Sequence, residues 1–352
     1  MAKAKKKLLP KDFEETLKNR SLKDLRTLFE TYDVNARGGY CKQTALAFAE
    51  CPDKLTRWLV ENGADLDAVD QFGDTPLHSR SRRWKSRIQI LLELGADVNH
   101  GEGENMHGTP LHAAAGSYIV ANAAILLGHG ARVNAVNRCH QTPLEYALQR
   151  CANINIGHMA ALAELLLEAG ARQKLAMKDS VARIGADFEF HRSNFNSKFL
   201  KATSKGLDKL YELFGVAPAP CRVFHDGKSR IVARSAGWED QHRELWDLLV
   251  PSSGASRTVQ GEVVRIAGRI HDELERNGGI NWDSQYKRMA DAFLAHVASG
   301  NSLAESLLIE ARELVASIKR KKGDTRRVCE LGVNWVALNP IPLKLAPPDY
   351  DR

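Results

Sequence analysis

Short apolar clusters recur along the first half of the chain at nearly regular intervals. Each cluster is followed, three residues later, by a glycine. This pattern predicts a series of short helices that each bury one apolar side and end at a left-handed glycine cap. The clusters are Leu59-Val60, Ile90-Leu91-Leu92, Ile125-Leu126-Leu127 and Leu165-Leu166-Leu167, and the glycines are Gly63, Gly95, Gly130 and Gly170.

A second marker keeps the same phase. Thr75-Pro76-Leu77-His78 recurs as Thr109–His112, in altered form as Thr142–Glu145, and earlier as Thr44–Ala47. The steps between the threonines are 31, 34 and 33 residues. Threonine can cap a helix through its hydroxyl, and proline in the first turn has no N–H to lose. Each marker therefore predicts the start of another helix, so every repeat contains a helix pair.

Two markers in one phase make residues 12–172 resemble the ankyrin-repeat family, whose period is about 33 residues. The resemblance implies a mainly α solenoid of about five helix pairs with β-hairpin loops. Asp12–Asn19 and Leu25–Glu30 fit a divergent N-terminal capping pair. The resemblance also gives His78 and His112 a structural role, tying one repeat to the next. We expect a basic disordered tail over residues 1–11 and an ankyrin domain over residues 12–174.

Three departures from the family pattern stand out. Ser79–Trp84 carries arginines where the family has small residues, so this repeat is either distorted or presents a basic surface, because a buried arginine head is costly. The hairpin segment His100–His107 is long, and extra residues surround Cys151–Gly157. Insertions in solenoids gather on one side of the array, often the binding side.

Residues 175–352 show no repeat and predict a mostly helical α+β domain that resembles no nameable family. Helices are expected at 175–186, 202–213, 262–275, 290–298 and 303–318, followed by an extended strap over Val333–Leu345. Asp226-Gly227 between Val223–His225 and Ile231–Val232 predicts a short β-hairpin. Some segments resemble bacterial domains in their residue pattern, and this resemblance implies no activity.

Composition limits the function classes only loosely. The 50 basic and 43 acidic residues give a net charge of +7, too small an excess to indicate nucleic acid as the partner. No apolar run is long enough to span a bilayer, and no apolar stretch follows the basic N-terminus. The six cysteines are scattered, which favours reduced thiols and a cytoplasmic address. Export as a secreted effector stays open.

No residue is assigned a catalytic, cofactor-binding or metal-binding role. His225 and Asp226 lie at the predicted turn. Glu262, His271, Asp272 and Glu275 are interpreted as a solvated helix face, because no HExxH or matching ligand set accompanies them.

We therefore expect a cytosolic, bacterial interaction protein, of inhibitor, immunity or effector type, that binds another protein through its hairpin tips and concave face. The expected contact residues are Tyr40, Gln71, Phe72, Asn105, Met106, Arg138 and His140 at the tips, and Arg83 and Trp84 on the irregular helix. One alternative is a C-terminal enzyme delivered to its substrates by the repeats. Another is a nucleic-acid-associated protein that uses the basic clusters Arg80–Arg87 and Lys319–Arg327. The sequence identifies neither the partner nor the oligomeric state.

Overall fold

The computed structural model describes residues 4–351, which form a mainly α-helical chain divided into two compact units. The first unit comprises residues up to Phe188 together with Asn196–Ala219. The second comprises Glu189–Phe195 and Pro220–Arg352.

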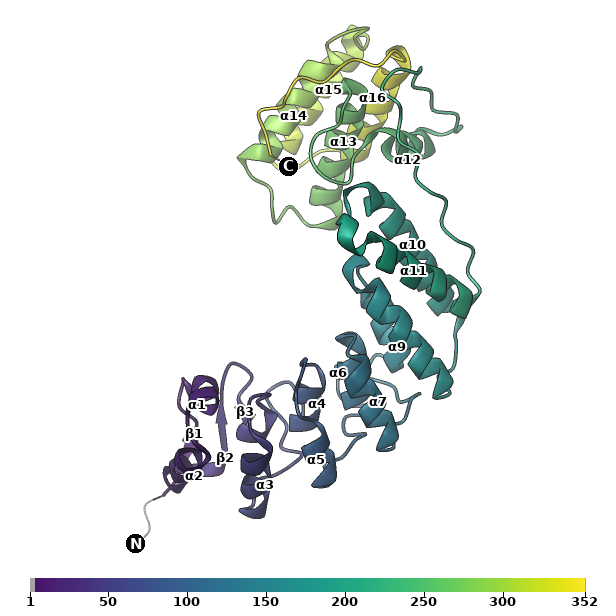
Figure 1. Ribbon diagram of the computed structural model, residues 1–352. Coiled ribbons are helices and arrows are strands. Elements are labelled where there is room, and N and C mark those ends of the chain that lie inside the picture. Colours follow the sequence, from purple (N-terminus) through teal and green to yellow (C-terminus); the bar gives the residue numbers. More distant parts are fainter. Residues whose placement is uncertain (1–3, 352) are drawn as a thin grey trace. The chain divides into compact units, whose positions relative to one another are not determined.

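The first unit is a row of stacked helix pairs (Figure 1). The pairs are α1 Phe13–Asn19 with α2 Leu22–Thr31, η1 Ala45–Ala47 with α3 Asp53–Glu61, α4 Pro76–Ser81 with α5 Gln89–Glu93, α6 Pro110–Gly116 with α7 Val120–Gly128, and α8 Pro143–Arg150 with α9 Ile156–Glu168. A short 3-10 turn, η2 Asn153–Asn155, lies in the lengthened connection before α9. The helical series that the two markers predict is confirmed.

The local caps explain where these helices begin and end. Thr75 Oγ1 accepts a hydrogen bond from the His78 amide at 3.2 Å. Thr142 Oγ1 accepts from the Glu145 amide, and Glu145 Oε2 accepts from the Thr142 amide at 2.8 Å, which completes a capping box. The glycines after the second helices all have positive φ: 89° at Gly63, 97° at Gly95, 86° at Gly130 and 90° at Gly170.

The N-terminal segment is ordered where the sequence predicted a disordered tail. β1, Lys6–Leu8, pairs in parallel with β2, Tyr32–Gly38, which also pairs with β3, Gln43–Thr44, in the antiparallel sense. Leu9 is buried, and its amide donates to the Arg37 carbonyl at 2.9 Å. The expectation of disorder is therefore wrong for this stretch, because Leu9 has an apolar site against the first repeat. Residues 1–3 lie outside the described residues.

The first unit continues past Lys174, where the sequence analysis placed the domain boundary. α10, Leu175–His191, and α11, Ser197–Phe214, follow the array as a further helix pair, and α11 packs against α9. A Cβ on Gly206 would lie 2.9 Å from Gly157 Cα, so the two helices approach at paired glycines. The repeat markers stop at Gly170, but the stacking does not.

The arginine-rich repeat does not expose all of its charges. Arg80 in α4 is fully buried, so at this position the repeat does not present the basic surface that was one of the two expectations. Its guanidinium donates to the Leu46 carbonyl at 2.7 Å, the Arg87 carbonyl at 3.0 Å and Thr56 Oγ1 at 3.1 Å. These acceptors replace water around the charge, so a bulky residue fits where a small one is usual.

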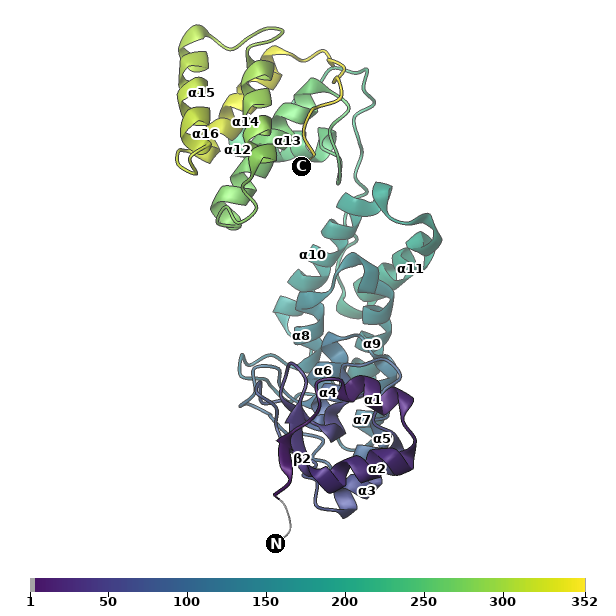
Figure 2. The same ribbon diagram turned by 90° about the vertical axis from the view of Figure 1, so that its left-hand side faces the viewer.

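The second unit is a helical bundle around α13, Val259–His271. α13 packs against α12 (Trp238–Leu249), α14 (Ser284–Val297) and α16 (Thr325–Leu338), and α15 (Glu305–Ile318) packs against α14 and α16 (Figures 1 and 2). A π-helical turn, η4 Asp272–Arg276, extends α13. The buried side chains of Ile266, Phe293 and Trp335 belong to its core.

The predicted hairpin in this unit is wrong. Asp226 does form a turn, accepting from the amides of Lys228 and Ser229 at 2.7 Å each. The flanking segments do not pair with each other, because they find other backbone partners. The His225 amide donates to Leu248 at 3.0 Å and the Ile231 amide to Pro340 at 2.8 Å.

The C-terminal strap is shorter than predicted, because α16 continues to Leu338. The chain then runs extended along the bundle, with an isolated bridge between Thr258 and Lys344. Tyr350 near its end is buried.

Candidate functional site

The loop tips between successive helix pairs of the first unit form a continuous, hydrogen-bonded edge. We call the tips at Tyr40, Phe72, Met106 and Arg138 the finger row. The Gln71 side chain donates to the Tyr40 carbonyl at 3.0 Å. In the next tips, Asn105 Nδ2 donates to the Gly73 carbonyl at 2.8 Å, and the Arg138 amide donates to the Asn105 carbonyl at 3.0 Å. Each tip is thus fixed by the one before it.

Aromatic rings follow this edge at regular spacing. The Tyr40 and Phe72 ring centroids are 6.4 Å apart, and those of Phe72 and His107 are also 6.4 Å apart. His107 stacks on His78 at 6.0 Å. Tyr40 is 87% exposed, Phe72 47% and Met106 52%, so large apolar side chains stand in solvent on a rigid base.

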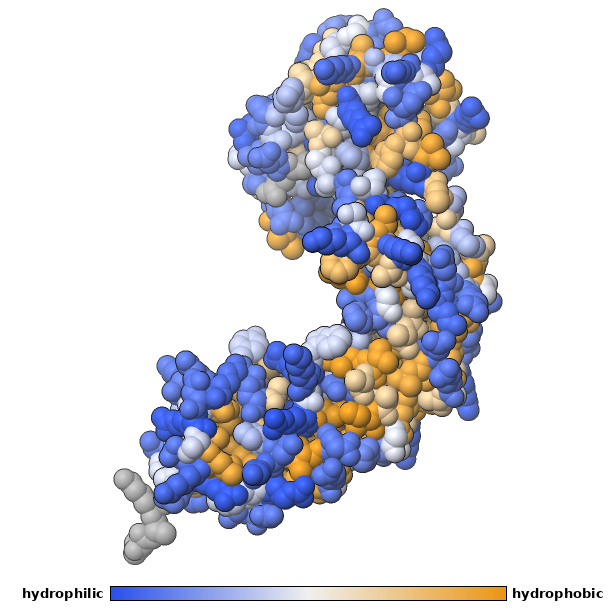
Figure 3. Space-filling model, viewed as in Figure 1, coloured by the Kyte–Doolittle hydropathy of each residue, from blue (hydrophilic) through white to orange (hydrophobic). Residues whose placement is uncertain are grey.

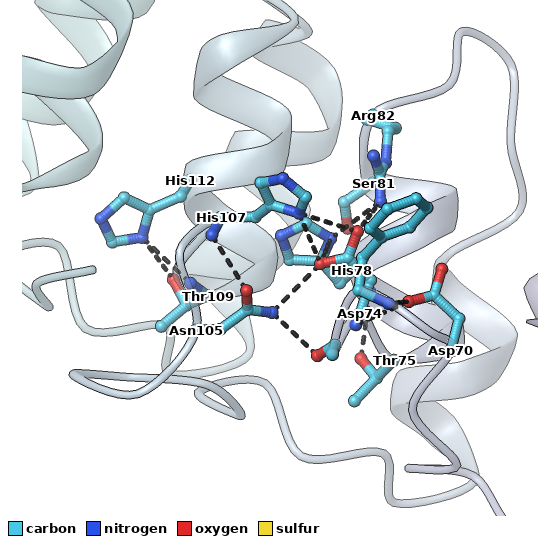
Figure 4. Close-up of polar contacts among 12 residues, drawn as sticks. Asp70, Asp74, Thr75, His78, Ser81, Arg82, Asn105, His107, Thr109 and His112 are labelled. Carbon is cyan, nitrogen blue, oxygen red and sulfur yellow. Dashed lines mark hydrogen bonds and ion pairs between the residues drawn. The ribbon is translucent and has the colours of Figure 1, made fainter. Parts of the chain in front are cut away.

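A buried carboxylate lies beneath the middle of the row (Figure 4). Asp74 Oδ1 lies 3.0 Å from His107 Nδ1, 3.1 Å from Asn105 Nδ2 and 3.3 Å from His78 Nδ1. Arg82 forms an ion pair with the other carboxylate oxygen. This cluster joins two successive repeats and orients His107, whose ring continues the aromatic row.

Burial and neighbouring charge set the ionisation of this cluster. Burial acts to raise the pKa of Asp74, but the charges of His78 and Arg82 and the hydrogen bonds from His107 and Asn105 outweigh it and lower the pKa. Burial lowers the pKa of His78 to about 4, although Asp74 opposes that shift. At neutral pH the cluster therefore holds a carboxylate and a neutral His78, with Arg82 as the compensating cation.

The two histidines of the repeat marker differ in their bonds. His112 Nδ1 accepts from the Thr109 amide at 3.1 Å, and Nε2 lies 2.9 Å from the Gln141 carbonyl of the next repeat. His112 therefore ties repeats together as the family resemblance implied. His78 contributes through Asp74, through a backbone hydrogen bond with His107 and through ring stacking.

The structure places seven of the nine predicted contact residues at the loop tips and two elsewhere. The seven are Tyr40, Gln71, Phe72, Asn105, Met106, Arg138 and His140. Arg83 and Trp84 follow α4. Arg83 lines a cavity of about 100 Å³ together with Cys41 and Arg82. Trp84 is 64% exposed, with its ring 5.6 Å from that of His158 in α9.

Sequence reasoning missed Asp74, Arg82 and His107, which build the base of the finger row. Asp74 immediately precedes the Thr-Pro-Leu-His marker, and His107 lies two residues before the next marker threonine. The acidic residue before one marker and the histidine before the next were the only sequence signals for this cluster. Their meeting depends on two repeats stacking, which a single marker does not show.

Burial and ion pairs engage part of each basic cluster. In the first cluster Arg80 is buried, Arg82 pairs with Asp74, and Arg87 lies 3.7 Å from Asp53. In the second cluster the pairs lie between different elements, except for one within α16. Its pairs are Lys319 with Asp291, Arg326 with Glu239, and Arg327 with Glu310 and Glu330. This weakens the nucleic-acid alternative, which needs cations free to meet phosphates.

The acidic residues of α13 do not form one solvated face, so that interpretation is wrong for Glu262. Its carboxylate is fully buried and accepts from Arg265 at 2.6 and 2.9 Å, from the Ser256 amide at 2.8 Å and from the Tyr350 hydroxyl at 2.8 Å. Asp272 does lie at the surface, paired with Arg276 at 3.3 Å. Glu262 stabilises the bundle rather than facing a substrate.

Residues 4–351 contain neither a metal-ligand cluster nor a membrane-spanning helix. No group of three or more His, Cys, Asp or Glu side chains among them is arranged to hold a metal ion. None of the helices in this range combines the length and apolar character needed to cross a membrane.

Apolar surface also gathers around α6, α7 and α9, on the face seen in Figure 3. The nine residues of α7 include no charged side chain, and its Ala121 and Ala124 are exposed. The residues of this surface differ in type from those of the finger row, where aromatic and amide side chains predominate.

Comparison with known proteins gives one family match. Residues 44–79 match the family model for ankyrin repeats (many copies). They span the marker threonines Thr44 and Thr75, η1, α3 and most of α4.

Three curated relatives match parts of the chain. A rice (Oryza sativa subsp. japonica) protein named as a probable E3 ubiquitin-protein ligase is 35% identical over 102 residues, 28% of this chain and 20% of the relative. Human ankyrin repeat and SOCS box protein 16 is 34% identical over 150 residues, 40% of this chain and 33% of the relative. A fowlpox virus protein named for its ankyrin repeats is 43% identical over 58 residues, 16% of this chain and 11% of the relative. The chain thus spans at most a third of each.

Proposed function

From the premise that the first half of this chain is an array of ankyrin repeats, which are protein–protein interaction modules, we propose that the finger row is the docking site for a protein partner. The observation that carries the proposal is the row of exposed apolar side chains, Tyr40, Phe72 and Met106, on tips that hydrogen-bond to one another.

Rigid exposed aromatics suit this role for a physical reason. Burying Phe72 and Tyr40 against a partner removes apolar area from water, while the bonded tips have little conformational freedom left to lose. Aromatic and arginine side chains are also those that most often dominate binding energies at interfaces. Arg138, exposed at the end of the row, supplies the arginine.

The cavity beside the finger row extends the proposed surface to η1 and α4. Cys41, Arg82 and Arg83 line it, and Ser79 of α4 contributes to the same wall. A partner side chain inserted there would meet hydrogen-bond donors from both arginines. Trp84 remains a proposed contact residue, but through its own exposed ring near α9 rather than through the row.

The test begins by finding the partner with a photo-cross-linking amino acid at position 72 of the full-length protein. Affinity for the captured protein is then measured for Phe72→Ala, Met106→Ala and Arg138→Ala. We expect a loss of about tenfold or more for at least one of them, in keeping with interface hot spots. Ile154→Ala is the matched control, because Ile154 is 76% exposed and lies outside the finger row.

Unchanged affinity in Phe72→Ala and Arg138→Ala would refute the assignment of this surface. A tenfold loss in Ile154→Ala alone would move the site to the connection between α8 and α9.

The proposal also includes a location and a biological role. Free thiols at exposed Cys139 and Cys221 favour a reducing compartment, and hence a cytoplasmic location. An inhibitor, immunity or effector role in a bacterium would be tested by the identity of the captured partner. The matched relatives come from a plant, a virus and a human, so none of them favours a bacterial source.

A further inference from the structure

The second unit contains a cavity that the docking proposal does not use. It has a volume of about 500 Å³ and lies among α12, α13, η4 and α16. That volume is within the range of small-molecule sites, about 300–1,000 Å³. From its lining we propose that it binds a small planar aromatic anion, a ring bearing one carboxylate or phosphate.

One wall is a stripe of aromatic rings on a single face of α12. Trp238, His242 and Trp246 are four residues apart in turn, so they share that face. The His242 and Trp246 ring centroids are 6.1 Å apart and tilted by 32°. Burial lowers the pKa of His242, which keeps this ring uncharged at neutral pH. The stripe offers ring faces on which a planar ligand can stack.

The opposite helix is shaped to accept this stripe. A Cβ on Gly268 of α13 would meet the Trp246 ring at 2.4 Å and His242 Cε1 at 3.2 Å. Glycine at this position therefore lets both rings lie close to the α13 backbone, and any larger residue would displace them.

Arginines from three elements supply the charge. Arg243, Arg276 and Arg326 line the cavity with only two carboxylates, Glu239 and Asp272. Each arginine has an acidic partner: Arg326 pairs with Glu239, Arg276 with Asp272 at 3.3 Å, and Arg243 with Asp240, outside the lining, at 3.1 Å. A guanidinium has five N–H donors and a carboxylate engages at most two of them in a bidentate pair, so donors remain for a ligand anion. Arg326 also lies over the Trp238 ring, 5.8 Å from its centroid, which places cation and stacking surface together.

A hydrogen-bond relay orients one more lining side chain, His271. The Thr325 hydroxyl donates to Glu275 Oε1 at 3.1 Å, since a carboxylate only accepts. The Thr325 hydroxyl oxygen also lies 2.9 Å from His271 Nδ1. Because the hydroxyl hydrogen is used for Glu275, this oxygen must accept a hydrogen bond from Nδ1. Nδ1 then carries a proton, and in the neutral ring Nε2 is the acceptor for an N–H or O–H of the ligand. His271 directly precedes the π-helical turn Asp272–Arg276, a feature frequent at functional sites.

The chemistry points to binding rather than to catalysis by a thiol. Cys329 also lines the cavity, but burial, with the charges of Asp272 and Asp324, raises the pKa of its thiol to about 12. Such a thiol is not a nucleophile at neutral pH.

The test is a titration of the full-length protein with two anionic probes, adenosine monophosphate and indole-3-acetate, against the neutral adenosine and 3-methylindole. Calorimetry and tryptophan fluorescence report binding. We expect saturable binding of at least one anionic probe, and binding about tenfold weaker or more for its neutral counterpart. The two probes distinguish a phosphate from a carboxylate ligand. No binding by any probe up to millimolar concentration overturns the proposal, and equal binding of the neutral compounds overturns its anionic part.

Variants locate the site. Arg326→Met should weaken the bound probe about tenfold, whereas Arg312→Met should not, because Arg312 pairs with Glu305 at 3.4 Å and does not line the cavity. Equal effects of the two variants overturn the assignment.

A wild-type measurement covers the case in which Arg326→Met fails to fold. Indole N–H signals from protein labelled with ¹⁵N-tryptophan should shift for Trp238 and Trp246 when the probe binds. Shifts confined to the other four tryptophans, Trp58, Trp84, Trp282 and Trp335, would refute the site. Histidine ¹⁵N shifts should show the Nδ1–H form of His271, and an Nε2–H form would overturn the proposed acceptor.

Discussion

At the scale of single residues, the first unit buries charged side chains, which the amino-acid composition does not indicate. Arg80 is a buried cation that donates hydrogen bonds to two carbonyls and a hydroxyl. Asp74 is a buried anion shared by two histidines, an asparagine and an arginine. A buried polar group is tolerated when its hydrogen bonds are complete, and its removal leaves the partners unsatisfied.

Arg80→Leu should therefore destabilise the first unit by about 2–4 kcal/mol, because the Leu46 and Arg87 carbonyls lose their donor. Urea unfolding followed by tryptophan fluorescence measures the change. Arg87→Leu is the control. Its surface pair with Asp53, at 3.7 Å, should contribute under about 1 kcal/mol. Equal losses in the two variants would contradict the role given to Arg80.

Stability of the first unit should fall on acidification. Burial lowers the pKa of His78 and of His112 to about 4, below the ordinary value of 6.5. Between these values the unfolded chain binds more protons than the folded one, so the free energy of unfolding decreases as pH drops from 6.5 towards 4. The expected loss is about 2 kcal/mol for each histidine.

The measurement is the urea midpoint at pH 7 and pH 4.5. His112→Asn should reduce the pH dependence, whereas His140→Asn should not, because His140 is exposed. A dependence unchanged in both variants would show that other groups cause it.

At the scale of elements, the ends of the first unit depend on close backbone approach. β1 joins β2 because Leu9 fits over Gly38, where a Cβ would lie 2.7 Å from Leu9 Cβ. At the other end α11 meets the start of α9 at Gly206 and Gly157. In both places glycine, which has no side chain, lets another element pack closely on the terminal repeat. That element covers the apolar side of a repeat that has no further repeat beside it, as the end of a solenoid requires.

Gly38→Ala should displace β1 and destabilise the unit by about 1–3 kcal/mol, the usual effect of overpacking. Hydrogen exchange of the Leu9 amide reports it directly, since that amide donates to Arg37. Gly128→Ala at the end of α7 has no atom within 4 Å of the new Cβ and should be neutral or slightly stabilising. Full protection of Leu9 in Gly38→Ala would contradict the close-packing argument.

At the scale of the whole molecule, the chain has two compact units with separate cores. The second core is organised by the buried ion pair Glu262–Arg265, which also receives the Tyr350 hydroxyl from the C-terminal strap. Burial acts to raise the pKa of Glu262, but Arg265, the Ser256 amide and Tyr350 together lower it, so the carboxylate stays ionised.

Glu262→Ala should destabilise the second unit by about 3–5 kcal/mol, because it removes the carboxylate that pairs with the buried Arg265 charge. Hydrogen exchange followed by mass spectrometry should show lost protection in α12–α16 and retained protection over residues 44–170. Glu305→Ala, whose carboxylate is 71% exposed, is the control and should change stability by under about 1 kcal/mol. Loss of protection in both units would contradict the separation of their cores.

Much of the first half was predictable because its signals are local. A threonine cap, a proline in the first turn and a terminal glycine each act within a few residues, so the helix pairs follow from short motifs. In the second half the helices over 262–275, 290–298 and 303–318 overlap α13, α14 and α15 for a similar reason, their apolar spacing. The Asp226 turn also depends on nearby residues. A hairpin would have required its two flanking segments to hydrogen-bond to each other, but they bond to other parts of the chain.

The sequence by itself determined the repeat array, its period and the loop tips that expose Tyr40 and Phe72, since these depend on neighbouring residues along the chain. Only the tertiary structure decided the strand β1, the extra helix pair, the shielding of Arg80 and the cavity beside His271. Each of these joins residues far apart in sequence: 34 positions separate Arg80 from Leu46, and 50 separate Glu275 from Thr325. Contacts at such separations arise from stacking and packing of whole elements, which no local motif encodes.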